Sequence, residues 1–185
     1  MAESRLRWER EAIALIRVLG HDELPTAPAA ICCQAVFCPT FHPAACLTLA
    51  LGAEAGELWL SILRGSRADA VARAGRESGG HPGAAPRLEA SVELDRAASA
   101  ELRRRLADCQ PAKLGDRLLA SRDGISVWCR YADPQLAHTI HMSSPSAAEA
   151  PQHMRLLRIL LAAAKARIDD AAIQDYLATL DGYFQ

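Results

Sequence analysis

The chain has 185 residues, half of them apolar, with 21 basic and 22 acidic side chains and a net charge of −1. A chain of this length can bury a core without disulfides or a structural metal, so we expect one domain over residues 1–185. The balanced charge argues against nucleic acid or an anionic membrane as a partner. We find neither a secretory signal nor a run of about 18 charge-free apolar residues, and we expect a cytoplasmic protein without a membrane segment.

An amphipathic helix is predicted at the start of the chain, over residues 4–19. Gly20 ends the helical pattern, and the prolines that follow it favour a loop. We assign residues 1–20 to a helix that braces an edge of the sheet described below. The apolar residues that recur at helical spacing are Trp8, Ala12, Leu15 and Leu19.

Two hairpins are predicted within residues 30–145. In the first, the runs 46–51 and 57–63 flank the loop GAEAG, whose terminal glycines suit a turn. In the second, the runs ISVWCRY and LAHTIHM flank the turn ADPQ, where Asp133 and Pro134 supply turn-forming side chains. One more short strand is predicted over 87–93.

Three helices are predicted in the second half of the chain. One begins at Asp95 or Ser99 and ends before Pro111, so it is inserted between strands. Two more occupy residues 150–185, where the pattern MRLLRILLAAAKARI is apolar almost all round and should pack on more than one side. We therefore predict a two-layer α+β fold, with an antiparallel sheet of about five or six strands and helices mainly on one face.

Residues 65–85 are predicted to form a long loop without regular structure, because small residues and glycines dominate them. The arginines in and beside this loop are candidates for binding an anion, although the same charges would suit a solvated loop. Trp128 is a further binding candidate, as an interface anchor or a core residue. The arginine candidates are Arg64, Arg67, Arg73 and Arg76.

Six cysteines and one nearby histidine raise the question of a metal or redox site. On a strand, Cys33 faces away from Cys32 and Cys38, so these three cannot form one site. Cys38, His42 and Cys46 could meet across a turn, but they offer only three ligands and no paired C-x-x-C. We expect no cofactor and no metal, and we expect the thiols to be buried as small hydrophobic groups. A metal or redox sensor through these three residues is the weaker alternative.

A hydrolase is the main alternative to a binding protein. Asp123 and His138 could act as an acid and base pair, with His42 as a third member. The sequence has no G-x-S-x-G nucleophile elbow, so this hypothesis rests on residue types alone.

The order of several short motifs resembles a family of uncharacterised bacterial proteins. The segments that carry the resemblance are CPTFHP at 38–43, GGHPG at 79–83, RDG at 122–124 with Trp128, and His138 with SSP at 143–145. In that family we expect a T-F-H-P turn, a G-G-x-x-G loop, a D-G-x-x-W strand and a later histidine followed by S-P. The resemblance supports an α+β fold and implies no known activity.

These observations favour a small non-enzymatic protein that binds a protein partner. An immunity-type or adaptor role, in which the protein masks a toxin or effector, is our hypothesis.

Overall fold

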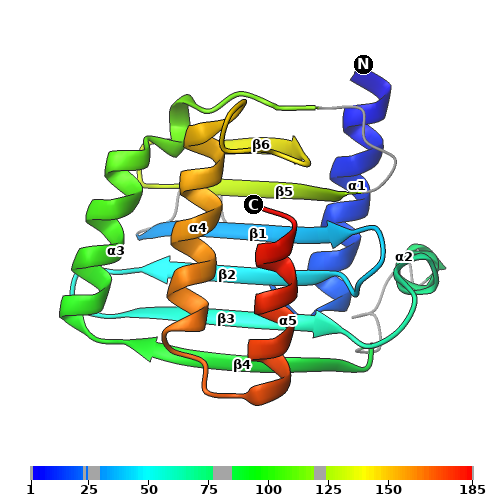
Figure 1. The fold of residues 1–185 in the computed structure, drawn as a ribbon, viewed down its shortest axis with the longest axis horizontal. Coiled ribbons are helices and arrows are strands. Elements are labelled where there is room, and N and C mark those ends of the chain that lie inside the picture. The colour runs from blue at the N-terminus through cyan, green and yellow to red at the C-terminus, as the bar shows by residue number, and fades with distance from the viewer. Residues whose placement is uncertain (1, 23, 25–29, 77–84, 119–123, 185) are drawn as a thin grey trace.

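The computed structural model describes residues 2–22, 24, 30–76, 85–118 and 124–184. Within these residues the chain forms five α-helices and six strands (Figure 1). The helices are α1 (Ala2–Val18), α2 (Arg67–Arg76), α3 (Arg96–Cys109), α4 (Pro151–Lys165) and α5 (Ala171–Gly182), with a short 3-10 turn at Pro111–Lys113. The strands are β1 (Ile31–Pro39), β2 (Ala45–Leu51), β3 (Gly56–Leu63), β4 (Arg87–Leu94), β5 (Ile125–Ala132) and β6 (Ala137–Ser143).

The strands described form one sheet in the order β4-β3-β2-β1-β5-β6, and every neighbouring pair is antiparallel. The chain runs β1 to β4 as a meander, and β5 then returns to the free side of β1 (Figure 1). The predicted α+β class, with its antiparallel sheet, is confirmed. Both predicted hairpins are present, as β2–β3 and β5–β6.

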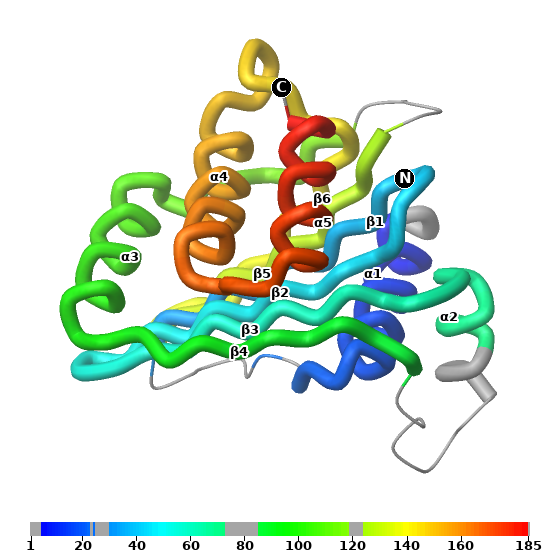
Figure 2. Tube along the Cα trace, turned by 60° about the horizontal axis from the view of Figure 1, so that its bottom comes forward, coloured from blue at the N-terminus to red at the C-terminus, as the bar shows by residue number. Residues whose placement is uncertain are grey.

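Helices α3, α4 and α5 cover one face of the sheet (Figures 1 and 2). Alternate residues of the strands point to this face, so Cys33, Ala35 and Phe37 of β1 lie in the same cluster as the leucines of α4. Leu156, Leu157 and Leu160 of α4 are fully buried. Each such leucine contributes roughly 1.5–3 kcal/mol by leaving water, which is why α4 is apolar around most of its circumference.

Helix α1 lies on the opposite face of the sheet (Figure 2), not at an edge as the sequence suggested. Its buried residues Leu15 and Ile16 belong to the same cluster as Val36 of β1, Cys46 of β2 and Trp128 of β5. These three strand residues make the centre of the sheet apolar on the face away from α4. An apolar face is stable only when another element covers it, and α1 is the element that does so. The edge placement was wrong because the amphipathic pattern of α1 specifies one apolar stripe but not the surface that receives it.

Residues 67–76 form helix α2, whereas the sequence analysis placed them in a loop over 65–85. The Ser66 hydroxyl accepts a hydrogen bond from the Asp69 N–H at 3.3 Å, and Asp69 stands in the first turn. The alanines between the arginines favour a helix, and buried Ala70 lies in the same cluster as α1. The glycine-rich segment GGHPG lies outside the described residues.

Aspartates cap two helices and shape one turn, and for Asp95 and Asp133 these are the roles expected from the sequence. Asp95 accepts a hydrogen bond from the Ala98 N–H at the start of α3, and Asp170 accepts one from the Ile173 N–H at the start of α5. Asp133 accepts hydrogen bonds from two backbone N–H groups in the β5–β6 turn.

The two edges of the sheet differ. At β6, the Arg117 N–H donates to the His141 carbonyl and the Ser143 N–H donates to the Arg117 carbonyl, both at 2.8 Å, so residue 117 covers part of that edge. In the described part of the sheet, β4 pairs only with β3. Its exposed residues Glu89 and Glu93 point to the α1 side of the sheet.

None of the described helices is long and apolar enough to cross a membrane.

A buried polar chain anchors the end of α1 to the sheet. The Gln34 amide donates to the Thr48 hydroxyl at 3.0 Å, and the His21 ring is hydrogen-bonded to Thr48 at 2.8 Å and to Ser61 at 3.0 Å. One consistent assignment has the Thr48 hydroxyl donating to His21 Nδ1 and His21 Nε2–H donating to Ser61. The ring also stacks on Trp59, with centroids 4.1 Å apart. Burial and the nearby charge of Arg87 lower the pKa of His21 to about 4, so the ring is neutral at pH 7.

Acidification from pH 7 to 4 is expected to destabilise the protein through His21. Between the ordinary pKa of 6.5 and the folded value of about 4, the unfolded chain binds the proton and the folded protein does not. The contribution of neutral His21 to the free energy of unfolding is therefore fully present above about pH 6.5. It falls by about 3 kcal/mol as the pH reaches 4. Urea unfolding of the wild type and of His21→Gln over this range measures the effect. Identical pH slopes in the two proteins would contradict it.

Candidate functional site

An open groove of about 440 Å³ lies between α3 and α4. Its lining comes from one residue of α3 and four of α4, and three of the five are arginines. The lining residues are Arg105, Pro151, Arg155, Arg158 and Ile159. The arginines make the groove cationic, and the exposed ring of Pro151 adds apolar surface, while Ile159 is buried beneath them. The groove is therefore suited to a ligand that carries both negative charge and apolar surface.

The amphipathic pattern of each helix explains why arginines reach this groove. In α3, Leu102, Leu106 and Cys109 are buried, so Arg105 emerges beside this buried stripe. In α4, Arg155 and Arg158 are three residues apart and lie on one exposed face of an otherwise buried helix. Because the two helices pack side by side on the sheet, these polar faces meet across their junction (Figure 1).

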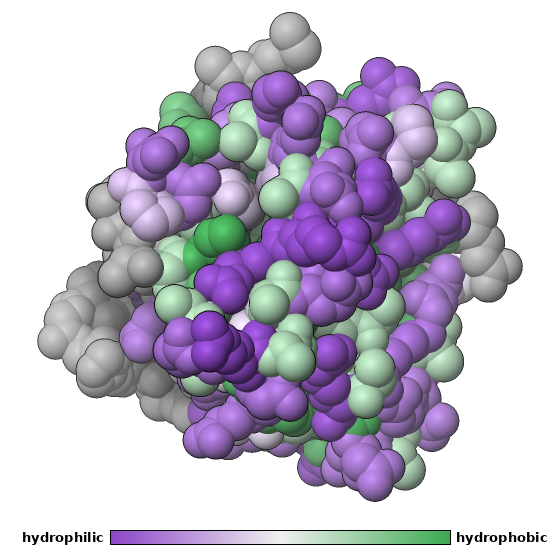
Figure 3. Space-filling view, turned by 90° about the vertical axis from the view of Figure 1, so that its left-hand side faces the viewer, coloured by the Kyte–Doolittle hydropathy of each residue, from purple (hydrophilic) through white to green (hydrophobic). Residues whose placement is uncertain are grey.

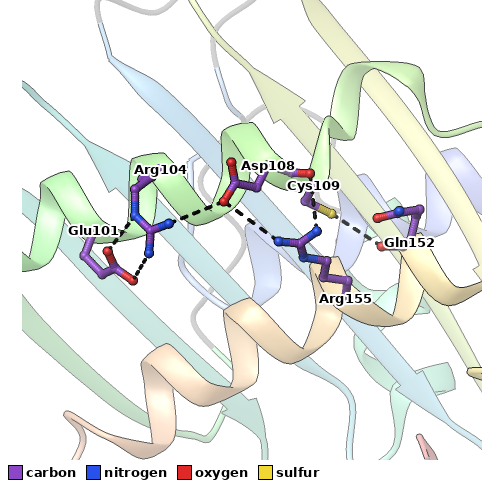
Figure 4. A network of polar contacts seen from close by, with 6 residues as sticks. All are labelled: Glu101, Arg104, Asp108, Cys109, Gln152 and Arg155. Carbon is purple, nitrogen blue, oxygen red and sulfur yellow. Dashed lines mark hydrogen bonds and ion pairs between the residues drawn. The ribbon is translucent and has the colours of Figure 1, made fainter.

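An ion-pair network adjoins the groove and reaches it through Arg155 (Figure 4). Asp108 of α3 stands 3.5 Å from Arg104 and 3.9 Å from Arg155 of α4, and Arg155 also donates to the Asp108 carbonyl at 3.5 Å. Arg104 further pairs with Glu101 at 2.9 Å. Arg104, Asp108 and Arg155 are each about half exposed, so each pair contributes at most about 1 kcal/mol to stability. The network positions Arg155 and offsets part of its charge.

Arg105 and Arg158 differ from Arg155, because neither of their side chains has a hydrogen bond or an ion pair among the described residues. Arg158 is exposed and Arg105 is partly buried. Two cations held near each other in water repel by on the order of 1 kcal/mol or less, which the fold tolerates. An anion between them would replace this repulsion with charge-assisted hydrogen bonds. Figure 3 shows that strongly hydrophilic side chains gather over this side of the molecule.

The sequence analysis placed its arginine candidates elsewhere. Arg67 pairs with Glu11 of α1 at 3.3 Å, and Arg64 is exposed at the end of β3. The side chains of Arg73 and Arg76 lie outside the described residues. The arginine run at 103–105 was visible in the sequence, but its meeting with α4 depends on helix packing that no local pattern reveals.

Trp128 does not offer a surface for binding. It is only 7% exposed, and it packs beneath α1 in the second hydrophobic cluster. The register pairs it with His141 of β6, whose ring lies 5.4 Å from the ring of Trp8. Trp128 is thus a core residue, the second of the two roles considered for it.

The structure separates two of the three hydrolase candidates. His138 lies level with Tyr131 and Cys33 across the sheet, whereas His42 follows the other end of β1, beyond Pro39. The strand from Cys33 to Pro39 alone covers roughly 20 Å at about 3.3 Å per residue. The His138 ring donates to the Leu114 carbonyl at 2.6 Å, and the His42 ring is hydrogen-bonded to the Tyr183 hydroxyl at 2.8 Å. The third candidate, Asp123, lies outside the described residues.

The three metal candidates do not share one side of the sheet. Cys38 and Cys46 belong to the cluster under α1, while His42 contacts Tyr183, which follows α5 on the other side. Burial raises the pKa of the Cys38 thiol to about 11 and that of the Cys46 thiol further. Within the described residues, no three His, Cys, Asp or Glu side chains form a group that could hold a metal ion.

Comparisons with known proteins yield no relative. No protein-family model matches the chain, and neither curated proteins nor solved structures give a match. The resemblance to a bacterial family of unknown activity stays a prediction.

The native thiols are expected to resist alkylation, because all six cysteines are buried without disulfides. At pH 7.5, a thiol with a pKa of about 11 such as Cys38 has about 100-fold less reactive thiolate than an ordinary one. Mass spectrometry after brief treatment with iodoacetamide should find Cys38 and Cys46 unmodified in the native protein and modified in guanidinium chloride. Rapid native labelling of either residue would contradict the assignment and revive the redox alternative.

Proposed function

We propose that this protein is a non-enzymatic binding protein whose partner is another protein, and that α3 and α4 form the surface of contact. The observation that carries the proposal is the pair Arg105 and Arg158, two arginines without partners among the described residues, in a groove between two helices. Arginine is enriched at the energetic centres of protein interfaces, because its planar guanidinium donates several directed hydrogen bonds and its stem covers apolar surface.

The proposed biological role is of the immunity or adaptor type, in which the protein masks a toxin or effector. A rigid surface suits such a role, since a partner loses less free energy in binding groups that are already ordered. Helix α4 provides that rigidity, because its other side is buried in the core.

Recovery of the partner from the native source tests the proposal. Tagged wild-type protein is expected to yield a discrete complex in native mass spectrometry. The double variant Arg105→Glu/Arg158→Glu should recover at least about tenfold less of it, because the groove then repels the anionic groups it would otherwise bind.

The matched control is Arg7→Glu/Arg10→Glu on α1, which makes the same change in net charge on exposed residues across the sheet. This control should recover the partner as the wild type does. Equal recovery by the groove variant, or turnover of a substrate by purified protein that binds no protein, would overturn the proposal.

A further inference from the structure

We infer that the α3–α4 groove binds an acidic segment of the partner in which an apolar side chain stands between carboxylates. This inference rests on the proposed function and specifies the chemistry of the contact. It follows from the lining of the groove, which combines guanidinium groups with the exposed apolar ring of Pro151.

The sign of the ligand charge follows from the balance of charges at the groove. The five lining residues include three cations and no anion. Asp108 lies at the margin and already engages Arg104 and Arg155, so it does not neutralise Arg105 or Arg158. A cationic segment would be repelled, and a neutral one would leave these two guanidinium groups without a directed partner.

The size of the groove favours a peptide segment over a small anion. About 440 Å³ is comparable to the space taken by several side chains and far exceeds one phosphate or sulfate ion. The guanidinium groups come from two helices, with Arg105 on α3 and both Arg155 and Arg158 on α4. A segment with carboxylates on either side of an apolar residue can engage both helices at once and contact the exposed ring of Pro151.

Other exposed arginines do not form such a site. Arg7 and Arg10 belong to a single helix, α1, and do not line the α3–α4 groove. Arg96 pairs with Glu54 at 3.4 Å, and Arg103 donates to the Ala53 carbonyl at 3.2 Å. The α3–α4 junction is therefore distinguished by convergence of cations and not by the number of arginines alone.

Fluorescence anisotropy with three labelled pentapeptides tests the inference on the full chain. The first peptide has four acidic residues around a central leucine, the second has the corresponding amides, and the third has glycine in place of leucine. The wild type is expected to bind the first peptide at least about tenfold more tightly than the second, and more tightly than the third. Raising the salt from 50 to 500 mM (about a tenfold change in ionic strength) should weaken the binding.

Three variants locate the binding. Arg105→Gln/Arg158→Gln should lower the affinity for the acidic leucine peptide at least about fivefold, and Arg7→Gln/Arg10→Gln should leave it unchanged. Asp108→Ala should raise it about twofold, because Arg155 loses its competing carboxylate. Circular dichroism and thermal unfolding establish that each variant is folded, as expected for changes at exposed or partly exposed positions.

Other outcomes separate this inference from the proposed function. Equal binding by the groove and α1 variants, or equal binding of the amide peptide, overturns the inference. So does inorganic phosphate that competes as strongly as the acidic peptide, since the site would then serve a small anion. If no acidic peptide binds but recovery of the native partner still depends on Arg105 and Arg158, the inference fails and the proposed function stands.

Discussion

Burial of β1 on both faces is the constraint on which the rest of this structure depends. Every residue from Cys32 to Pro39 is buried, which is unusual for a strand in an antiparallel sheet. One face therefore requires α4 and α5, and the other requires α1. The cysteines of β1 fit this environment as small apolar groups, and the Cys33 thiol lies 3.6 Å from that of Cys129 on the next strand.

Several elements could be predicted because their signals are local. The β2–β3 hairpin follows from alternating apolar residues around GAEAG, and α3 and α5 begin where Asp95 and Asp170 cap them. The position of α1 could not be predicted in this way. It depends on the pairing of β1 with β5, which joins residues about a hundred positions apart and makes the second face apolar.

The candidate groove escaped prediction for the same physical reason. The 3-10 turn at Pro111–Lys113 and the strands β5 and β6 separate α3 from α4 in the chain, and only the packing of α3 against α4 brings Arg105 and Arg158 to one groove. The sequence analysis favoured Arg64, Arg67, Arg73 and Arg76 because they lie in or beside a predicted loop. In the folded protein Arg67 pairs with Glu11 and so stabilises the contact between α2 and α1. The local sequence around Arg67 does not distinguish this structural role from ligand binding.

The unequal edges of the sheet bear on how this molecule can associate. Strand β6 is partly covered by residue 117, and the edge strand β4 carries Glu89 and Glu93 exposed on the α1 face of the sheet. Acidic side chains on an edge strand oppose the addition of another strand, including one from a second copy of the same chain. Addition of a strand at this edge is thereby disfavoured, whereas the exposed side chains of the helical surface can be changed residue by residue without disturbing the backbone pairing of the sheet.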